Sequence, residues 1–265
     1  MNGLSTVNIE LTSRCNKNCW MCGRRKVERD YPELALAYGG MDMQMVESIA
    51  GQLPDGIVVQ FHNNGEPLLY PELGKALGLF PHQVRCLDTN GKLLMKQADD
   101  IIGNLDTISV SVFEDDPEAD SQYAILKEFM QYKGHDKPLV VARCLGKVDT
   151  TPYAYLGCLI ATRILHNPMG NFGYTSPPTI PEIGICLDAL HHLSIDRNGN
   201  VSPCVRLDPK GAGVLGNCQH ASLSNIWYGQ SRRAFLAQHI DGSRDALPLC
   251  STCHYWGVPT GGAHV

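Results

Sequence analysis

The chain has 265 residues, of which 43% are hydrophobic, and a formal net charge of -5. No apolar run approaches the roughly 20 residues that span a bilayer, and residues 1–14 lack the basic start and apolar core of a signal peptide, so we expect a cytoplasmic globular protein. The 22 basic residues form no nucleic-acid footprint, and we expect the triplet Arg24-Arg25-Lys26 to lie in a solvated loop.

Strand and helix signals alternate through the first two thirds of the chain. The expected strands cover residues 7–11, 57–61, 84–87, 107–113, 139–142 and 159–165, the last of which fits a helix equally well. The expected helices cover residues 41–53, 71–79, 94–102 and 124–132, the last with Ile125, Phe129 and Tyr132 aligned on one face. Six strands with helical crossovers and short connections favour an α/β fold, a curved, partial (β/α)6 barrel.

Each unusual motif of this region directly follows an expected strand. The motifs lie at residues 15–22, 62–67, 88–91, 111–113 and 143–144 and at His166. Chemistry gathers at the carboxyl ends of the strands in such sheets. We therefore expect the motifs to share one rim of the barrel.

The character of the sequence changes beyond the sixth expected strand. A stretch rich in proline and glycine comes first, then residues 193–201 form an expected hairpin with an Asn-Gly turn. Residues 223–235 form an expected helix that residues 236–240 continue. The expected domains are a barrel at residues 1–168 and a small cysteine-rich α+β domain at residues 169–265.

Three of the eleven cysteines lie in one loop after the first strand. The spacing of Cys15, Cys19 and Cys22 lets the loop wrap three corners of an iron-sulfur cube and leaves one iron without a protein ligand. A zinc site that lacks one ligand and three unremarkable thiols are the alternatives. The odd number of cysteines and the missing export signal indicate metal ligation in a reducing compartment.

At this loop the chain resembles the radical S-adenosylmethionine (SAM) superfamily, in which Cys-x3-Cys-x2-Cys follows the first strand. The resemblance implies that Cys15, Cys19 and Cys22 hold a 4Fe-4S cluster whose open iron chelates the methionine end of SAM. It also implies that one-electron reduction cleaves SAM to a 5'-deoxyadenosyl radical, which takes a hydrogen atom from a substrate.

A second motif follows the second expected strand. Gly65 lets the backbone approach a ligand closely, and Glu66 beside it can accept hydrogen bonds from an ammonium group. The run Asn64, Gly65, Glu66 and Pro67 resembles the family's Gly-Gly-Glu-like segment for the amine of SAM, with Asn64 where a glycine often stands.

Side chains after the third, fourth and fifth strands complete the expected SAM site. The resemblance implies that Thr89 and Asn90 contact the ribose and sulfonium end of SAM, although Asn-Gly is equally a turn signal. Ser111 resembles the family's serine for the SAM carboxylate or ribose, while Phe113 stands where an acidic residue is often found. Arg143 is placed to pair with the SAM carboxylate or to make a surface salt bridge.

The tail resembles the SPASM/twitch extension of radical SAM enzymes, which carries auxiliary iron-sulfur clusters. The resemblance implies that Cys186, Cys204, Cys250 and Cys253 hold one auxiliary 4Fe-4S cluster. Four cysteines closed by one Cys-x2-Cys pair are also a structural zinc pattern, which stays an alternative.

Apart from Cys218, the remaining cysteines and the histidines are not expected to bind the clusters. Cys218 is interpreted as a substitute ligand, a hydrogen-atom donor or a plain thiol, whereas Cys86, Cys144 and Cys158 are expected to be small core residues. The spacing of the histidines fits no standard metal motif.

The sequence thus predicts a radical SAM enzyme that abstracts hydrogen from a small molecule in an oxidation, epimerisation or rearrangement. The first strand begins by about residue 6, without the leader-binding domain of many peptide-modifying SPASM enzymes, which favours a small molecule over a peptide. The second alternative is a non-catalytic iron-sulfur or zinc redox protein. We expect a flavodoxin or ferredoxin as electron donor and neither a membrane nor a nucleic acid as partner.

Overall fold

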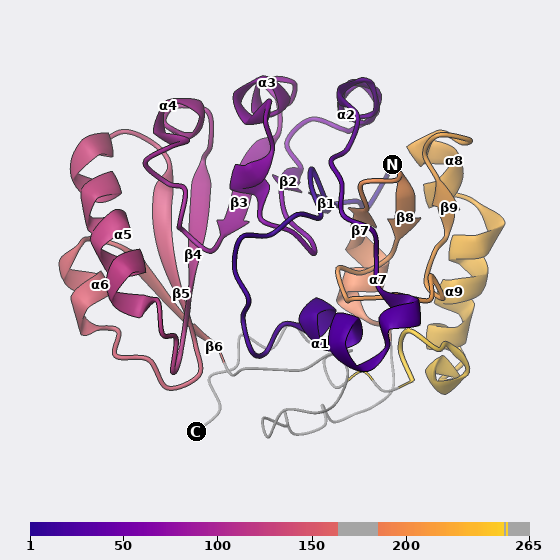
Figure 1. Ribbon diagram of the computed structural model, residues 1–265. Helices are drawn as coiled ribbons and strands as arrows, with labels where there is room; N and C mark the ends of the chain where they lie inside the picture. Colours follow the sequence, from indigo (N-terminus) through magenta and orange to yellow (C-terminus); the bar gives the residue numbers. More distant parts are fainter. Residues whose placement is uncertain (164–184, 252, 254–265) are drawn as a thin grey trace.

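The computed structural model describes residues 1–163, 185–251 and 253, and the strands of these residues form one nine-stranded sheet (Figure 1). The strand order is β6-β5-β4-β3-β2-β1-β7-β8-β9. The strands are β1 Thr6–Ile9, β2 Val58–Gln60, β3 Val84–Thr89, β4 Thr107–Phe113, β5 Leu139–Leu145, β6 Leu159–Arg163, β7 His192–Ile195, β8 Asn200–Ser202 and β9 Gly216–Asn217.

Helices connect these strands, and Figure 1 shows α2, α3 and α4 along one side of the sheet with α1 across from them. The helices are α1 Gly23–Asp30, α2 Met43–Ala50, α3 Leu73–Gly78, α4 Ala98–Ile101, α5 Ala119–Lys133, α6 Thr151–Tyr155, α7 Leu187–His191, α8 Leu223–Trp227 and α9 Gln230–Ile240, with 3-10 turns η1 Pro32–Leu34, η2 Pro67–Leu69 and η3 Arg244–Ala246. Within the described part of the chain, no helix is long and apolar enough to cross a membrane.

The first six strands confirm the expected partial barrel. From β1 to β6 every neighbouring pair is parallel, and helices lie between consecutive strands along the chain. Parallel strands need such crossovers because their ends lie on opposite edges of the sheet. The ambiguous sixth segment is a strand, since β6 pairs with β5 over its whole length.

The tail continues the same sheet. Strand β7 lies parallel to β1, with His192 opposite Thr6. Strand β8 returns antiparallel after a turn in which Gly199 has φ +82°, a conformation that suits glycine, so the predicted hairpin is confirmed. The carboxyl end of β7 therefore lies on the same rim as the carboxyl ends of the barrel strands.

The two faces of the sheet differ in polarity, because successive side chains of a strand point to opposite faces. The buried apolar side chains on the helix-covered face are Val7, Ile9, Val59, Phe61, Leu87, Ile108, Val110, Val140, Ala142, Leu193 and Ile195. The side chains at alternate positions on the opposite face, which we call the interior face, include Asn8, His62, Asp88, Ser111, Arg143, His192 and Ser194. The barrel interior thus offers polar groups to a ligand.

Two predicted helices differ from those observed. Residues 94–97 form turns, so α4 is only four residues long. Helix α5 is longer than predicted and packs through a different stripe, made of Gln122, Leu126 and Phe129. Tyr132, which was predicted to face inward, is 59% exposed and donates a hydrogen bond to Asp99. The hydrophobic periodicity did not predict the buried face of α5, because one residue of that face, Gln122, is polar.

Other local predictions are also corrected. The basic triplet is not in a solvated loop: it belongs to α1, where Arg24 and Lys26 are buried. Cys86 is only half-buried and lies on the interior face instead of in the core. The tail helix divides into α8 and α9 at Gly229, where a Cβ would lie 2.6 Å from the Asn225 carbonyl oxygen.

Some sequence predictions fall on residues 164–184, outside the described residues. They include the end of the sixth expected strand, His166 and the domain boundary between residues 168 and 169. That boundary therefore stays a prediction.

Phe61 offers a test of the helix-covered core. It is fully buried, and its ring packs edge-on against that of Phe80 at 5.2 Å between centroids. Truncation leaves a cavity, so Phe61→Ala should lower the free energy of unfolding by about 3–5 kcal/mol, measured by urea denaturation. Tyr155→Ala, at a side chain that is 87% exposed, should change it little. Equal losses in the two variants would contradict this packing.

Candidate functional site

Three thiols gather in the loop Cys15–Cys22, here called the cluster loop, which follows β1. All three are half-buried. Burial raises the pKa of Cys15 and raises that of Cys19 to about 12, and the nearby thiols add to both shifts because each would repel a neighbouring thiolate. The three thiols are therefore close enough to interact electrostatically, and their role as one ligand set stays a prediction.

Two arginines of helix α1 bind the backbone of the cluster loop and of the segment just before it. Arg24 donates a hydrogen bond to the Ser13 carbonyl oxygen, and Arg25 donates to the carbonyl oxygens of Cys15 and Lys17 at 3.3 and 3.2 Å. These bonds satisfy loop carbonyls that have no strand or helix partner. Arg24 and Arg25 thus help to fix the shape of the loop.

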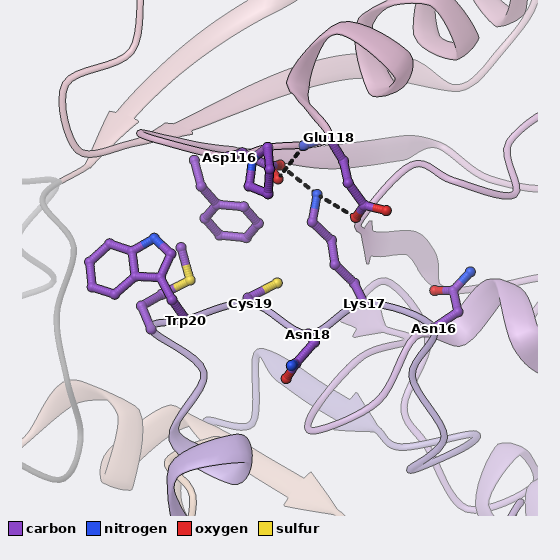
Figure 2. Close-up of a pocket in the computed structure, with 10 residues that line it drawn as sticks. Asn16, Lys17, Asn18, Cys19, Trp20, Asp116 and Glu118 are labelled. Atoms are coloured by element: carbon purple, nitrogen blue, oxygen red, sulfur yellow. Dashed lines mark hydrogen bonds and ion pairs between the residues drawn. The ribbon is translucent and has the colours of Figure 1, made fainter.

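A second anchor joins the cluster loop to the segment between β4 and α5 (Figure 2). Lys17 Nζ lies 2.5 Å from Asp116 Oδ2, and both side chains are 4% exposed. The same nitrogen lies 3.6 Å from Glu118, whose other oxygen is 2.5 Å from Lys92 Nζ. An ion pair this deeply buried is costly to leave half-made, so it fixes the distance between the two segments.

A cavity of about 410 Å³ opens beside this anchor. Cys19 and Trp20 border it from the cluster loop (Figure 2). Phe113, at the end of β4, also lines it. Lys17 Nζ also lies 5.7 Å from the centroid of the Phe113 ring, close enough for a cation–π contact. The cavity is large enough for part of a nucleoside-sized ligand next to the cluster loop.

Glu66 lies at the centre of the hydrogen bonds between the motifs. It is 2% exposed, and Oε1 accepts from Thr89 Oγ1 at 2.6 Å and from the Leu68 amide at 3.1 Å. Oε2 accepts from the Asn90 amide at 2.7 Å. Burial raises the pKa of Glu66, although these hydrogen bonds oppose the shift. Its observed contacts hold the Thr89-Asn90 turn, and contact with the SAM amine stays a prediction.

Gly65 is required by a close approach of two backbones. A Cβ at this position would lie 1.9 Å from the Thr12 carbonyl oxygen, so no other residue fits. The next residue's amide, that of Glu66, donates to the Arg14 carbonyl oxygen at 2.8 Å. Asn64 donates from its backbone and side chain to Glu10, at 3.0 and 3.1 Å. This segment therefore packs directly on the strand exit that leads into the cluster loop.

Asn90 and Gln122 link the Glu66 motif to the cluster loop and to strand β4. The Asn90 side chain donates to Asn16 Oδ1 at 2.8 Å and lies 4.0 Å from the Cys15 sulfur. Gln122 Nε2 donates to the carbonyl oxygens of Asn90 and Ser111 at 2.6 and 2.9 Å. The structure thus brings the cluster loop, Glu66, Asn90 and Ser111 together.

Arg143 makes contacts within the interior face. Its guanidinium pairs with Asp88 and donates to Ser111 Oγ at 2.8 Å. His62 Nε2 lies 3.3 Å from the same Asp88 oxygen. Burial disfavours the charged form of Asp88, but His62 and Arg143 outweigh burial and lower its pKa. A role for Arg143 at the SAM carboxylate stays a prediction.

A second group of thiols lies in the tail. Burial raises the pKa of Cys204 and of Cys250 to about 12. Cys186 adds to both shifts, and Cys253 adds to that of Cys250, so Cys186 lies near Cys204 and Cys250 and Cys253 lies near Cys250. Cys204 also lines a polar cavity of about 370 Å³ that reaches Asn63 on the barrel rim.

The two thiol groups fit the chemistry of iron-sulfur clusters. Among residues 1–163, 185–251 and 253, no three His, Cys, Asp or Glu side chains lie close enough together to hold a single metal ion. Cysteine thiolates are the usual protein ligands of iron-sulfur clusters, so the donor set suits such a cluster. Near the cluster loop, Gln122 Oε1 is buried and has no hydrogen-bond partner within the described residues, and a bound ligand can supply one.

Cys218 lies apart from both cavities. Its sulfur is 3.0 Å from the Cβ position of Gly199 at the hairpin turn, and the sulfur of Met45 is 3.2 Å from the same position. This position gives no support to a hydrogen-donor role, which stays a prediction.

Several residues of the candidate site were given no role by the predictions from the sequence. Lys17, Asp116 and Gln122 were missed because their partners lie far away in the chain. His62 and Asp88 did carry a signal, since each is the first residue of a motif that follows a strand, but no chemistry was assigned to them.

Comparison with known proteins agrees with this architecture. Residues 186–254 match the family described as SPASM, an iron-sulfur cluster-binding domain. The S-adenosyl-L-methionine-dependent 2-deoxy-scyllo-inosamine dehydrogenase of Niallia circulans is 23% identical over 97% of this chain and 95% of its own length.

Two solved structures share the fold. BtrN in complex with AdoMet and 2-DOIA has a TM-score of 0.67 and 20% identity, covering 98% of this chain and 97% of that chain. SuiB of Streptococcus suis, bound to S-adenosylmethionine, has a TM-score of 0.61 and 13% identity, covering 96% of this chain and 71% of that chain. The likeness therefore extends over the barrel and the tail together.

Lys17→Met should weaken the cluster loop. The change leaves Asp116 buried without its cation, a loss of about 3–5 kcal/mol for such a pair, so the variant should retain less iron after anaerobic reconstitution and desalting. Lys75→Met is the matched control, because the Lys75 side chain is 56% exposed and pairs loosely with Glu47 and Glu72.

A double variant separates charge from packing. Lys17→Met combined with Asp116→Leu removes both charges and should recover part of the lost iron. Iron retention by Lys17→Met equal to that of the unmodified protein would show that the buried pair does not hold the loop.

Proposed function

Because the chain is a radical SAM enzyme with a C-terminal SPASM domain, we propose that it oxidises a small polar molecule by abstracting a hydrogen atom from carbon. The observation that carries this proposal is the convergence of the three-thiol cluster loop with the Glu66 and Asn90 motifs at one rim. The polar interior face supplies the adjacent surface for a substrate.

We assign the cofactor ligands as follows. Cys15, Cys19 and Cys22 hold the SAM-binding 4Fe-4S cluster, and the tail ligands of the auxiliary 4Fe-4S cluster are Cys186, Cys204, Cys250 and Cys253. When bound, the first cluster and SAM supply a 5'-deoxyadenosyl radical that takes a hydrogen atom from the substrate.

The protein itself positions SAM and the substrate. Gly65 lets its segment pack against the Thr12 backbone, and the turn held by Glu66 presents Thr89 and Asn90 beside the cluster loop. The proposed SAM contacts are Asn64, Gly65, Glu66, Pro67, Thr89, Asn90, Ser111 and Arg143. Lys17 and its acidic partners keep the segment between β4 and α5 over the loop, which limits access of water.

A small-molecule substrate is supported by two observations. The relative that matches nearly the whole chain is named as a dehydrogenase of an aminocyclitol. The interior face carries hydroxyl, amide, imidazole, carboxylate and guanidinium groups, which recognise polar ligands by hydrogen bonds.

A peptide substrate is the second candidate. It is supported by the likeness of fold to SuiB, which is also known in a structure bound to its precursor peptide SuiA. A flavodoxin or ferredoxin in the cytoplasm is the proposed source of electrons for either substrate.

Release of 5'-deoxyadenosine tests catalysis. Reconstituted protein mixed with SAM and dithionite should release it, as measured by liquid chromatography, and Cys19→Ser should abolish the release because the cluster loses a ligand. Cys144→Ala, at a buried position on β5, should retain it. Silence of the unmodified protein with an intact cluster would leave the non-catalytic redox protein as the better interpretation.

Metal analysis tests the tail assignment. Eight irons in two 4Fe-4S clusters are about twice the iron of a protein with one cluster, so Cys250→Ala should lose roughly half of the iron and no zinc. Four irons with one zinc in the unmodified protein would replace the auxiliary cluster by a structural zinc site.

A further inference from the structure

The interior face carries a row of side chains joined by hydrogen bonds and ion pairs, of which the proposed cofactor contacts use only Arg143. At one end, His192 Nε2 lies 2.7 Å from Asn8 Oδ1, and Asn8 Nδ2 donates to the His62 carbonyl oxygen at 3.1 Å. At the other end, Asp88 joins His62 to Arg143. The row crosses β7, β1, β2, β3 and β5, and so spans the interior of the barrel.

We infer that His62, oriented by Asp88, accepts the hydroxyl proton of an alcohol substrate that lies on the interior face. This inference rests on the proposed function, because it adds a proton acceptor to an oxidation that begins by hydrogen-atom abstraction. It assigns the substrate to the secondary alcohols and the product to the corresponding ketones.

The assignment follows from the geometry of the imidazole. Nε2 lies 3.3 Å from Asp88 Oδ2, and this contact favours the tautomer that carries its proton on Nε2. Nδ1 of the neutral ring then has a lone pair. The Asn8 amide nitrogen lies 3.4 Å from both ring nitrogens, and it also donates to the His62 carbonyl oxygen at 3.1 Å. The His62 side chain is 19% exposed, so a ligand in the barrel can reach it.

Neighbouring groups are less suited to accept a proton. Glu66 is buried and accepts three hydrogen bonds, and Glu10 accepts a hydrogen bond from Asn64. Asp88 is held in its charged form by His62 and Arg143, which lowers its pKa and its basicity. Arg143 is always protonated.

Two nearby atoms suit a polyhydroxylated ligand. Within the described residues, Arg143 Nε and Asn63 Oδ1 are buried without a hydrogen-bond partner. The first is a donor and the second an acceptor, and Asn63 Nδ2 already donates to Ser194 Oγ at 3.1 Å. Hydroxyl groups can satisfy both, since each hydroxyl donates and accepts.

The reaction balances as a two-electron oxidation. The carbinol carbon gives up a hydrogen atom, which the SAM-derived radical takes to form 5'-deoxyadenosine. The hydroxyl oxygen gives up a proton to His62 Nδ1, and one electron leaves to an iron-sulfur cluster. The carbon–oxygen bond becomes the carbonyl of the product.

The acid–base behaviour gives the sign of the pH dependence. Burial lowers the pKa of His62, Asp88 opposes this shift and Arg143 reinforces it. His192 of β7 also faces His62, and burial lowers its pKa in the same way. His62 is therefore neutral at neutral pH, and ketone formation should fall as the pH drops through its lowered pKa.

The test uses the holoenzyme with SAM, dithionite and 2-deoxy-scyllo-inosamine, followed by myo-inositol and glucose-derived alcohols as further probes. His62→Gln should release 5'-deoxyadenosine while its ketone yield per deoxyadenosine falls by roughly a hundredfold. In this variant the rate of ketone formation should also no longer fall at low pH. His62→Ala with added imidazole should recover ketone formation, and His82→Gln, at an exposed histidine, should match the unmodified protein.

A binding measurement provides a readout without turnover. Isothermal titration calorimetry should show that the unreduced, SAM-loaded holoenzyme binds the alcohol that it oxidises. The His62→Gln substitution should change the dissociation constant of this alcohol much less than it changes the ketone yield.

The outcomes separate the two proposals. Absence of 5'-deoxyadenosine from the unmodified protein would remove the proposed function. Deoxyadenosine without ketone from every probe, or an unchanged ketone yield in His62→Gln, would overturn the role of His62 alone.

Discussion

Glu66 buries a carboxylate where three neighbouring strands end, and its oxygens accept hydrogen bonds from the Thr89 hydroxyl and from the amides of Leu68 and Asn90. A carboxylate removed from water is costly unless such bonds replace its solvation, so these groups must keep their places. Gly65 adds a steric limit, because its neighbour Thr12 leaves no room for a side chain. Together the two residues determine how the exits of β1, β2 and β3 face one another.

Features that depend on neighbouring residues could be predicted from the sequence. The alternation of strands and helices, the Asn-Gly hairpin turn and the spacing of Cys15, Cys19 and Cys22 are all local patterns. The sheet then brings the motifs to one rim because parallel strands end on the same side. The structure therefore agrees with the sequence on the partial barrel and on the proximity of its motifs.

Features that depend on distant partners could not be predicted. Lys17 and Asp116 are 99 positions apart, and no pattern in either segment identifies the other. Arg143 was expected to pair with the SAM carboxylate or to make a surface salt bridge, but the sequence did not identify its observed partner, Asp88, which is 55 positions away. The stripe of α5 was misplaced for a related reason: Gln122 is polar yet buried, since it bonds the carbonyls of Asn90 and Ser111.

The parallel pairing of β7 with β1 makes the tail a structural neighbour of the cluster loop. Strand β1 has β2 along one edge and β7 along the other, and it leads directly into that loop. Without the tail, β1 would expose a row of unpaired backbone groups, which invites association with other chains. The strand that leads into the first group of thiols is therefore completed along its other edge by a strand of the segment that carries the second group.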